Sequence, residues 1–368
     1  MIVVEELVDK GIRDKIFPGA AYGICYGLEE KRKKITEGVG RTSYADNAYA
    51  VDTQTLFDLA SLTKPMATVP AIASLIQQKK IFLTDPLSEL LETDVAADKK
   101  DITLFHLLSH SSGLPAHRPY YQLLGHVPVE KRKEIIVDAI LAEELQFTPG
   151  RISVYSDLGF MLLGHIVEIK THLPFDQYVY ERIFKPMKLP SPIFFNRGNI
   201  EPGKSAAATE NCPWRHTTLQ GVVSDENAYW LGGVAGHAGL FADVEAVLHF
   251  AIFLLDVWKK RRHHPAFDHD ILQKLLRCAG IKESTWALGF DTPSPEKSSS
   301  GRYFSAGSRG HLGFTGTSFW IDPERELVVV LLTNRVHPCR DNEAIKIFRP
   351  QFHDAVMEHL WSMLGEEG

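Results

Sequence analysis

Cysteine is scarce in this chain, and its spacing matches neither a zinc site nor a redox motif. The 368 residues include four cysteines, which lie far apart at Cys25, Cys212, Cys278 and Cys339. No two of them are separated by the two residues of a Cys-x-x-Cys motif. We therefore expect four reduced thiols rather than a disulfide framework, and no zinc bound through cysteine.

Long apolar runs are also missing. A membrane-spanning helix needs about 20 consecutive apolar residues, and the sequence contains no such stretch. Residues 1–10 lack the basic start and long apolar run of a signal peptide. The sequence therefore predicts a soluble, cytoplasmic protein without a membrane span, although an exported protein without its signal peptide would show the same pattern.

Positive charge is not in excess. There are 40 Lys and Arg against 46 Asp and Glu, which gives a net charge of -6. The short basic runs at residues 31–34, 131–133 and 259–262 stand beside carboxylates or apolar residues, as on solvated loops and helix faces. We expect no nucleic-acid partner. The hydrophobic fraction of 44% is typical of a soluble globular protein, and the length allows one large domain or two ordinary ones.

Two segments hold residues of ligand sites without the spacing that such sites need. His263, His264, Asp268 and His269 could imitate a metal cluster, but their spacing is not that of zinc ligands, and we expect them at the surface. Residues 232–239 are rich in glycine but lack the Gly-x-Gly-x-x-Gly pattern and follow no strong strand. We therefore expect no phosphate-binding loop there, and no metal or cofactor.

Strand patterns lie near both ends of the chain. A first helix ends near Phe17, and the apolar residues 20–26 lead through a charged hairpin into residues 35–40. Residues 310–321 and 326–333 are apolar and β-branched, with a turn between them. These patterns predict antiparallel neighbours in one sheet.

The middle of the chain is mostly helical, from residue 85 to about residue 189, and residues 342–364 also have helical spacing. The fold class that follows is α+β. We expect a discontinuous sheet domain of residues 1–85 and 240–368, and a mainly helical inserted domain of residues 86–239. The active site would lie at their interface.

Ser61 and Lys64 form the most informative pattern. A serine at a helix start has a lysine one turn later on the same face, so Lys64 can reach the hydroxyl of Ser61 and activate it. The helix dipole and the free N–H groups of the first turn favour negative charge at that position. Ser-x-x-Lys is common by chance, and the alternative is an N-terminal serine with a solvated lysine.

Tyr155 and His311 are the next candidates. Tyr155 follows a Pro-Gly turn and precedes an apolar helix, so its hydroxyl can point into a cleft. A lysine ammonium nearby should lower the tyrosine pKa from about 10 and make a phenolate base accessible. His311 stands among glycines at an apparent strand start, where a ligand can approach the backbone. The alternatives are a tyrosine packed in the core and a hydrogen-bonded structural histidine.

Together these segments resemble one family. Ser61-x-x-Lys64, Tyr155-Ser156-Asp157 and His311-Leu312-Gly313 have the order and approximate spacing of the S-x-x-K, S-D-N and K-T-G motifs of penicillin-binding proteins and serine β-lactamases. The sequence is most similar to the class C β-lactamase branch, which includes D-alanyl carboxypeptidases and related esterases. Its second motif is Tyr-x-Asn. The resemblance implies the β-lactamase/transpeptidase-like fold, with an antiparallel sheet flanked by helices.

The resemblance also implies roles for single residues. Ser61 would be the acylated nucleophile, Lys64 its proton-relay partner, and Tyr155 the general base that activates water for deacylation. The oxyanion hole would be formed by the backbone N–H groups of Ser61 and Phe314, which follows the third motif and Gly313. His237 is a further substrate-binding candidate, because similar proteins place such a stretch beside the cleft.

Two departures from the family pattern affect these roles. Asp157 replaces the usual asparagine, and its carboxylate should keep Lys64 protonated, which favours Tyr155 as the base. His311 replaces the usual lysine, is mostly neutral near pH 7, and binds a substrate carboxylate less strongly. This argues against an efficient β-lactamase, unless Arg335 or Arg340 supplies the missing cation.

The expected activity is hydrolysis through an acyl-enzyme without metal or cofactor. The substrate would be a small molecule or peptide: a D-amino-acid or peptidoglycan-derived amide, or a β-lactam. The alternatives are a carboxylesterase of the same family and a sensor that binds penicillins or muropeptides without turnover. The sequence does not indicate an oligomeric state.

Overall fold

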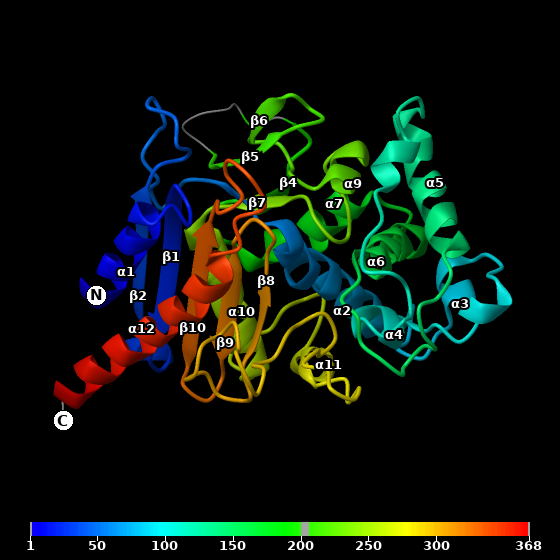
Figure 1. Cartoon of the computed structure of the whole chain (residues 1–368). Helices are drawn as coiled ribbons and strands as arrows, with labels where there is room; N and C mark the ends of the chain where they lie inside the picture. Colours follow the sequence, from blue (N-terminus) through cyan, green and yellow to red (C-terminus); the bar gives the residue numbers. More distant parts are fainter. Residues whose placement is uncertain (1, 199, 201–205, 367–368) are drawn as a thin grey trace.

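Strands from both ends of the chain form one antiparallel sheet in the computed structural model, which describes residues 2–198, 200 and 206–366. Within this part of the chain the sheet has five strands in the order β2-β1-β10-β9-β8 (Figure 1). They are β1 (Gly19–Tyr26), β2 (Lys33–Gly40), β8 (Arg309–Leu312), β9 (Ser318–Asp322) and β10 (Leu327–Thr333). β1 pairs with β10 over nearly its whole length, which brings the two ends of the chain together.

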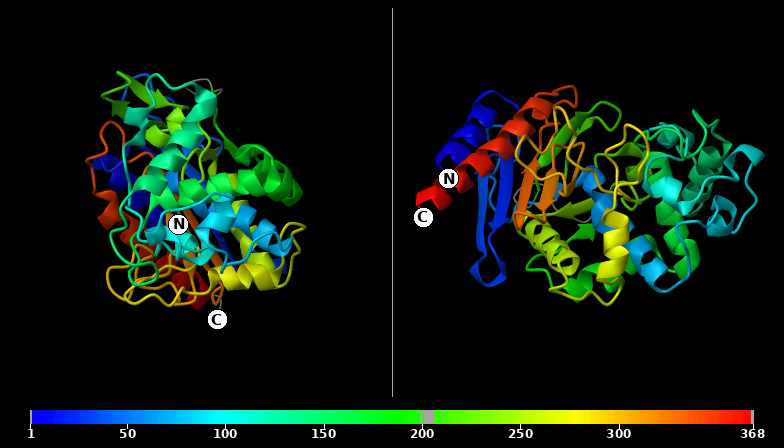
Figure 2. Two further views of the ribbon diagram at one scale, coloured as in Figure 1. Left: turned by 90° about the vertical axis from the view of Figure 1, so that its right-hand side faces the viewer. Right: turned by 90° about the horizontal axis from the view of Figure 1, so that it is seen from below.

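Side chains alternate between the two faces of this sheet, as the period of two residues requires. On β1, Tyr22 and Ile24 pack in the apolar cluster of α1 (Ile2–Arg13) and α12 (Ile345–Glu366). Ala21 and Cys25 belong to the cluster on the opposite face, which is covered by α10 (Val244–Trp258). Helices thus bury both faces of the sheet (Figure 2).

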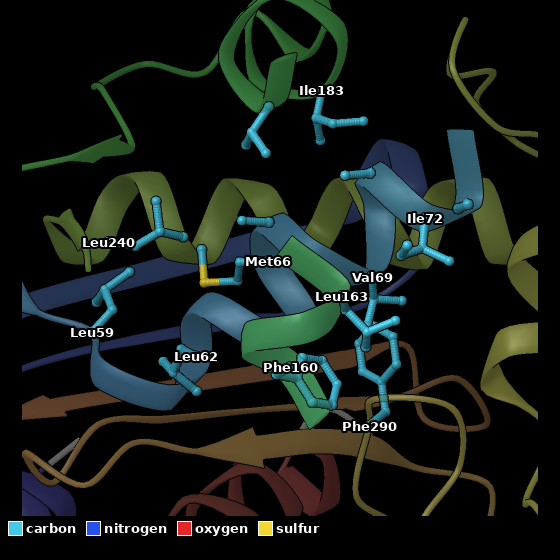
Figure 3. Close-up of a cluster of buried hydrophobic side chains, with 14 of the residues drawn as sticks. Leu59, Leu62, Met66, Val69, Ile72, Phe160, Leu163, Ile183, Leu240 and Phe290 are labelled. Carbon is cyan, nitrogen blue, oxygen red and sulfur yellow. The ribbon is translucent and has the colours of Figure 1, made fainter. Parts of the chain in front are cut away.

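The segment between the two groups of strands is mostly helical. Its helices are α2 (Val69–Gln77), α3 (Leu87–Leu91), α4 (Leu104–Leu108), α5 (Val129–Ala142), α6 (Asp157–Thr171), α7 (Phe175–Val179) and α8 (Lys185–Met187). α2 is apolar and buried on almost every side. Figure 3 shows Val69 and Ile72 of α2 in one cluster with Phe160 and Leu163 of α6. This packing fixes the turn that precedes α2, where Ser61 lies.

Short elements complete the fold around that turn. They are β3 (Phe57–Asp58), β4 (Phe194–Phe195), the hairpin of β5 (Ala208–Cys212) and β6 (Thr217–Gln220), α9 (Glu226–Trp230), β7 (Leu240–Ala242) and α11 (His269–Leu276). β7 pairs with both β3 and β4. Leu59 N donates to Leu240 O at 2.9 Å, so the chain just before Ser61 is held by a segment far away in the sequence.

The α+β class and the sheet built from both chain ends are confirmed. Two boundaries differ from the sequence prediction. Residues 310–321 form two strands rather than one, because His311 lies opposite Phe319 and the chain reverses between them. The first helix ends at Arg13 rather than near Phe17, whose ring instead packs against Phe348.

His264 is a correction to the surface position expected for the histidine-rich segment. Its side chain is buried, and its Nε2 donates to the carbonyl of Ile183 at 3.0 Å. Its ring also stacks on Phe267. Among the described residues there is no group of three His, Cys, Asp or Glu side chains that could hold a metal ion.

The four cysteines are free thiols. Cys25 and Cys212 are buried, whereas Cys278 and Cys339 are exposed. No helix in the described ranges has both the length and the apolar character that a membrane crossing requires.

Candidate active site

Ser61 lies in a strained turn rather than at the start of a regular α-helix. A 3-10 turn (Ala60–Leu62) is followed by a π-helical turn (Lys64–Thr68) and then by α2. Ala60 has a φ of 47°, a left-handed conformation that costs a residue with a Cβ about 1–3 kcal/mol. Asp58 offsets this cost, because its carboxylate accepts from Ala60 N at 2.9 Å and from Ser224 N at 2.7 Å.

Lys64 contacts every predicted residue of the first two motifs. Its Nζ donates to Ser61 Oγ at 3.0 Å, to Tyr155 OH at 2.6 Å and to Asp157 Oδ1 at 2.6 Å. The carbonyl oxygen of His237 lies 3.3 Å from the same nitrogen. The lysine side chain is fully buried. A buried ammonium group with these acceptors holds the serine and the tyrosine in fixed positions.

Asp157 decides the charge of this lysine. Burial, the largest single influence, would lower the pKa of Lys64, but Asp157 and then Tyr155 together outweigh it and raise that pKa. Burial would likewise raise the pKa of Asp157, but Lys64 and then His117 hold it well below its usual range. His117 Nδ1 lies 3.7 Å from Asp157 Oδ2. Lys64 and Asp157 therefore form a charged pair at neutral pH.

Tyr155 does not show the lowered pKa that its lysine neighbour predicts. Burial raises the pKa of Tyr155 to about 12, although Lys64 acts in the opposite direction. The ring lies among the rings of His110 at 4.7 Å, Trp286 at 5.4 Å and His311 at 6.0 Å between centroids. The sequence indicated that Lys64 would lie near Tyr155, but not that other rings would surround the phenol. Desolvation of the phenolate therefore has the larger effect on the pKa of Tyr155.

His311 is buried and neutral. Burial, with a smaller effect of the nearby Lys64, lowers the pKa of His311 to about 3. Its Nδ1 donates to the carbonyl of Leu312 at 2.7 Å, which fixes the tautomer with Nε2 as an acceptor. Nε2 is buried and has no partner among the described residues. At this position the chain therefore offers a hydrogen-bond acceptor, not a cation.

The turn after His311 is bound directly to the strained turn of Ser61. Thr315 Oγ1 donates to Asp58 O at 2.7 Å, and Thr317 Oγ1 donates to Leu59 O at 3.1 Å. A Cβ at Gly313 would overlap Thr317 Oγ1 and lie 2.6 Å from Leu59 O, so only glycine fits. These contacts place Phe314 at the same cavity as Ser61.

The cavity has a volume of about 570 Å³ and is lined by Ser61, Tyr155, Asp157, His311, Gly313 and Phe314. Arg335, Arg340 and Arg349 also line it. Such a volume is typical of small-molecule sites. The ring of Phe314 is 49% exposed, and two guanidinium groups lie over it, that of Arg335 at 4.6 Å and that of Arg340 at 5.7 Å from the ring centroid.

The two predicted arginines are engaged within the protein. Arg340 donates to Glu210 Oε2 at 2.7 Å and to Glu226 Oε1 at 2.6 Å, so two carboxylates neutralise it. Arg335 Nε donates to the carbonyl of Phe314 at 2.8 Å, and its Nη1 donates to two further carbonyls. Arg335 thus braces the loop behind the third motif. The pairing of Arg340 was not visible in the sequence, because Glu210 and Glu226 are distant from it along the chain.

His237 joins the site through its backbone rather than its ring. Its carbonyl accepts from Lys64, whereas its buried ring donates from Nε2 to Asp225 Oδ1 at 3.0 Å. Asp225 lines the cavity. Sequence reasoning did not assign a role to several neighbours that the fold brings here: Asp58, His110, His117, Asp225, Trp286 and Arg349. Of these, two lie in stretches that similar proteins share: His110 in residues 107–115 and Asp225 in residues 225–228.

Comparison with known proteins decides the family. The model of the family described as Beta-lactamase matches residues 4–350. The chain belongs to the β-lactamase family. It is 33% identical to the N-acetylmuramyl-L-alanine amidase of Bacillus subtilis (strain 168) over 316 residues, 79% of this chain and 70% of that protein. A Salmonella typhi protein with the provisional name D-alanyl-D-alanine carboxypeptidase is 32% identical over 312 residues, 77% of this chain and 70% of its own.

Solved structures show the same β-lactamase fold. EstCE1, a hydrolase with promiscuous acyltransferase activity, matches with a TM-score of 0.74 and 21% identity over 96% of this chain and 97% of its own. The octameric penicillin-binding protein homologue from Pyrococcus abyssi matches with a TM-score of 0.69 and 19% identity over 90% of this chain and 72% of its own. The resemblance to penicillin-binding proteins and serine β-lactamases that the motifs indicated is confirmed.

Proposed function

We propose that this chain is a hydrolase that uses Ser61 as its nucleophile and works through an acyl-enzyme. One observation carries the proposal: Lys64 Nζ bonds both Ser61 Oγ and Tyr155 OH at the wall of a cavity that can hold a substrate. A nucleophile and a base joined in this way are the signature of covalent catalysis. Membership of the β-lactamase family supports the same chemistry.

In the proposed reaction, Ser61 Oγ attacks the substrate carbonyl carbon, and its proton passes to the phenolate oxygen of Tyr155. The carbonyl oxygen becomes an oxyanion, which accepts hydrogen bonds from the backbone N–H groups of Ser61 and Phe314. Tyr155 then gives the proton to the leaving amine or alcohol. A water molecule gives a proton to Tyr155 and attacks the acyl-serine. The bond between the acyl carbon and Ser61 Oγ then breaks, the acid is released, and Tyr155 returns the proton to Ser61 Oγ.

Lys64 acts as a charged organiser in this scheme. The raised pKa of Lys64 keeps its ammonium group beside the tyrosine, where it stabilises the phenolate. The pKa of Tyr155, about 12, means that the phenolate is rare at neutral pH. Activity should therefore rise with pH across the neutral range, by up to about tenfold per pH unit.

The proposed substrate is an amide of a D-amino acid or of a peptidoglycan-derived peptide. The names of the Bacillus and Salmonella relatives support this class. Arg349 is the cavity residue suited to a peptide carboxylate, because it is buried and makes no ion pair with any described residue. β-Lactams, which carry the same carboxylate, are secondary substrates in this proposal.

Ester hydrolysis is a second candidate function. The observation that favours it is the weak positive charge at the third motif, where His311 is neutral and Arg340 is neutralised by two glutamates. An ester has a better leaving group than an amide and needs no carboxylate to be recognised. The two candidates share the nucleophile and differ in the group that the cavity recognises.

A panel of three substrates tests the proposal: a p-nitrophenyl ester, a D-alanyl-D-alanine peptide and a penicillin. Wild type should hydrolyse the ester and the peptide, whereas Ser61→Ala should hydrolyse neither. Ser362 is exposed on α12, so Ser362→Ala should behave as wild type. Turnover of the ester alone would favour the esterase. Stoichiometric acylation without release would favour a sensor. Hydrolysis by Ser61→Ala at the wild-type rate would refute the proposed nucleophile.

A further inference from the structure

Asp58 lies behind the wall of the catalytic cavity and binds three of the residues that form it. Its Oδ1 accepts from Ala60 N at 2.9 Å, and its Oδ2 accepts from Ser224 N at 2.7 Å. Its backbone carbonyl accepts from Thr315 Oγ1 at 2.7 Å. Ala60, Ser224 and Thr315 all line the cavity, whereas Asp58 does not. One residue therefore joins the turn of Ser61, the segment before α9 and the β8–β9 turn.

The carboxylate of Asp58 is buried without a compensating cation. The residue is 2% exposed and makes no ion pair with any described residue. Burial raises the pKa of Asp58 to about 6, although the N–H groups of Ser224 and Ala60 act in the opposite direction. A buried charge of this kind is costly, so its presence requires an explanation. An asparagine would carry no charge, but it has only one acceptor oxygen, and its NH₂ group would face one of the two N–H groups.

Two of these three hydrogen bonds lie next to the proposed oxyanion donors. Ala60 precedes Ser61 in the chain, and Thr315 follows Phe314. Phe314 N donates to no described residue, so it is available to an oxyanion. Because Ala60 has a left-handed φ of 47°, its bond to Asp58 sets the direction of the peptide group that carries Ser61 N. The spacing of the two donors thus depends on Asp58.

Asp58 is itself fixed by a sheet. It belongs to β3 and pairs with Phe241 of β7. The next residue, Leu59, donates from its N to Leu240 O at 2.9 Å, and Figure 3 shows these two side chains next to each other. A residue on a strand holds a functional group more precisely than a residue on a loop does.

Two charged side chains act on the carboxylate of Asp58. Asp225, from the segment before α9, raises the pKa of Asp58, and Arg215, from the turn between β5 and β6, lowers it. β7 and the β8–β9 turn contact Asp58 through uncharged residues. Arg215 also donates to the carbonyls of Val223 and Ser224, at 2.7 and 3.1 Å. Ser224 is therefore held at its N–H group by an anion and at its carbonyl by a cation.

We propose that Asp58 is a positioning residue for the oxyanion hole: its ionised carboxylate keeps the backbone N–H groups of Ser61 and Phe314 at the spacing that a tetrahedral intermediate needs. This inference rests on the proposed function and adds a residue to it. Protonation of Asp58 turns one acceptor oxygen into a donor, so the bond to Ala60 N or to Ser224 N is lost. The hole then opens, and the transition state is stabilised less, whereas the substrate binds as before.

Asp58→Asn tests the inference in steady-state kinetics with a p-nitrophenyl ester. The variant should lose at least about tenfold in kcat with a nearly unchanged KM, because oxyanion donors act in the transition state. A kcat equal to that of wild type, or a loss that lies in KM alone, would overturn the inference.

Asp322→Asn is the matched control. Asp322 is also buried and accepts from backbone N–H groups, among them those of Ser305 and Glu324, but it does not line the catalytic cavity. This variant should have a lower melting temperature and the kcat of wild type. An equal loss of kcat in Asp322→Asn and Asp58→Asn would mean that any lost buried carboxylate impairs the enzyme, which would also overturn the inference.

The pH dependence separates positioning from a general loss of structure. In wild type, kcat/KM should fall more steeply below about pH 6 than above it, because Asp58 is then protonated in addition to Tyr155. In Asp58→Asn this steeper acid limb should be absent. A pH-rate profile from pH 5 to 8 measures the difference, and tryptophan fluorescence at each pH shows whether the chain is folded. The same acid limb in both proteins would contradict the role of Asp58.

A second pair of variants leaves Asp58 in place. Thr315→Val removes the hydroxyl that is bound to Asp58 O and should lower kcat at least about tenfold, whereas Thr315→Ser, which keeps the hydroxyl, should lose less. In the double variant of Asp58→Asn and Thr315→Val, the loss should be smaller than the product of the two single losses, because both changes act on the same two donors. Losses that multiply would show that the two bonds act independently and would overturn the inference.

The rate at which a fluorophosphonate labels Ser61 separates this inference from the proposed function, because phosphonylation also places an oxygen in the oxyanion hole. If Asp58→Asn is labelled at least about tenfold more slowly than wild type, both proposals stand. If the two proteins are labelled equally fast, the nucleophile stands and the role of Asp58 falls. If wild type is not labelled at Ser61, the proposed function falls, and the role of Asp58 in it falls as well.

Discussion

Lys64 is a single buried charge that affects the proton affinity of each group around it. Asp157 keeps the lysine protonated, and the same carboxylate also raises the pKa of Tyr155. Burial acts on these groups as strongly as their charged neighbours do. At the scale of single residues, the protonation of the site is therefore set by the balance between desolvation and one ion pair.

Replacing the carboxylate should shift the pH dependence of activity. Without the negative charge in Asp157→Asn, the pKa values of Lys64 and Tyr155 both fall, so the base forms at lower pH. The rise of kcat/KM for a p-nitrophenyl ester should move towards acid by about one pH unit or more. A pH-rate profile from pH 5 to 10 measures this shift. An unchanged or alkaline-shifted profile would show that Asp157 does not control the base.

Removing the phenol tests the base itself. Tyr155→Phe should lower kcat about 10²–10⁴-fold, because no other group in the proposed scheme takes the proton of Ser61. Steady-state kinetics with the same ester measure the loss. Tyr180→Phe, at an exposed tyrosine on a surface turn, is the control. If Tyr155→Phe keeps more than about a tenth of wild-type kcat, the base has been misassigned.

At the scale of elements, the catalytic geometry depends on one turn held against another. The β8–β9 turn is fastened to the strained turn of Ser61 by the hydroxyl groups of Thr315 and Thr317. Gly313 is the position where these two turns approach most closely. Separation of the turns would move Phe314 N away from Ser61, and the proposed oxyanion hole would open.

Gly313→Ala should therefore impair both stability and activity. The added Cβ has no space beside Thr317 and Leu59, and overpacking of this kind costs about 1–3 kcal/mol. We expect a lower melting temperature and at least about a 100-fold loss of ester hydrolysis. Gly125→Ala is the matched control, since nothing lies within 4 Å of a Cβ built there. Equal behaviour of the two variants would contradict the role given to this turn.

Local patterns were sufficient for the strands and helices but not for these turns. The period-two alternation of β1 and β10 depends on residues next to each other in sequence, so both strands could be predicted. The reversal between His311 and Phe319 could not, because the apolar pattern continues through it. The strain at Ala60 could not be predicted either, because Asp58, which accepts from Ala60 N, is itself held by Ser224 N, far away along the chain.

At the scale of the whole molecule, residues from distant parts of the chain line the catalytic cavity. Ser61 and His311 come from the parts of the chain that form the sheet, and Tyr155 comes from the helical segment. The division into a discontinuous domain of residues 1–85 and 240–368 and an inserted domain of residues 86–239 stays a prediction. The order of the three motifs was enough to predict the candidate catalytic residues. The substrate was not predictable, because the pairing of Arg340 with Glu210 and Glu226 depends on the folded chain.

Buried histidines should make the fold sensitive to acid. Burial, and then Arg349, lowers the pKa of His353 to about 3, and both ring nitrogens lack partners among the described residues. A neutral buried histidine contributes stability that is complete above its unfolded pKa of about 6.5 and is lost as the pH falls towards 3. Between pH 7 and pH 5 this loss amounts to about 2 kcal/mol.

His353→Leu removes this linkage. When the pH falls from 7 to 5, the free energy of unfolding of His353→Leu should gain about 2 kcal/mol relative to that of wild type. Any effect of the leucine that does not depend on pH cancels in this comparison. Urea unfolding at the two pH values measures the difference. His263→Leu, at an exposed histidine, should show no such change. A parallel pH dependence in wild type and His353→Leu would mean that His353 has the same pKa in the folded and the unfolded chain, which would contradict its burial as a neutral group.

The identity of the nucleophile is the central claim, and intact-mass analysis after reaction with a fluorophosphonate tests it most directly. Wild type and Ser362→Ala should each gain one phosphonyl group, mapped to the peptide that contains Ser61, and Ser61→Ala should gain none. Labelling of Ser61→Ala to the wild-type extent, or a modified peptide without residue 61, would contradict the account.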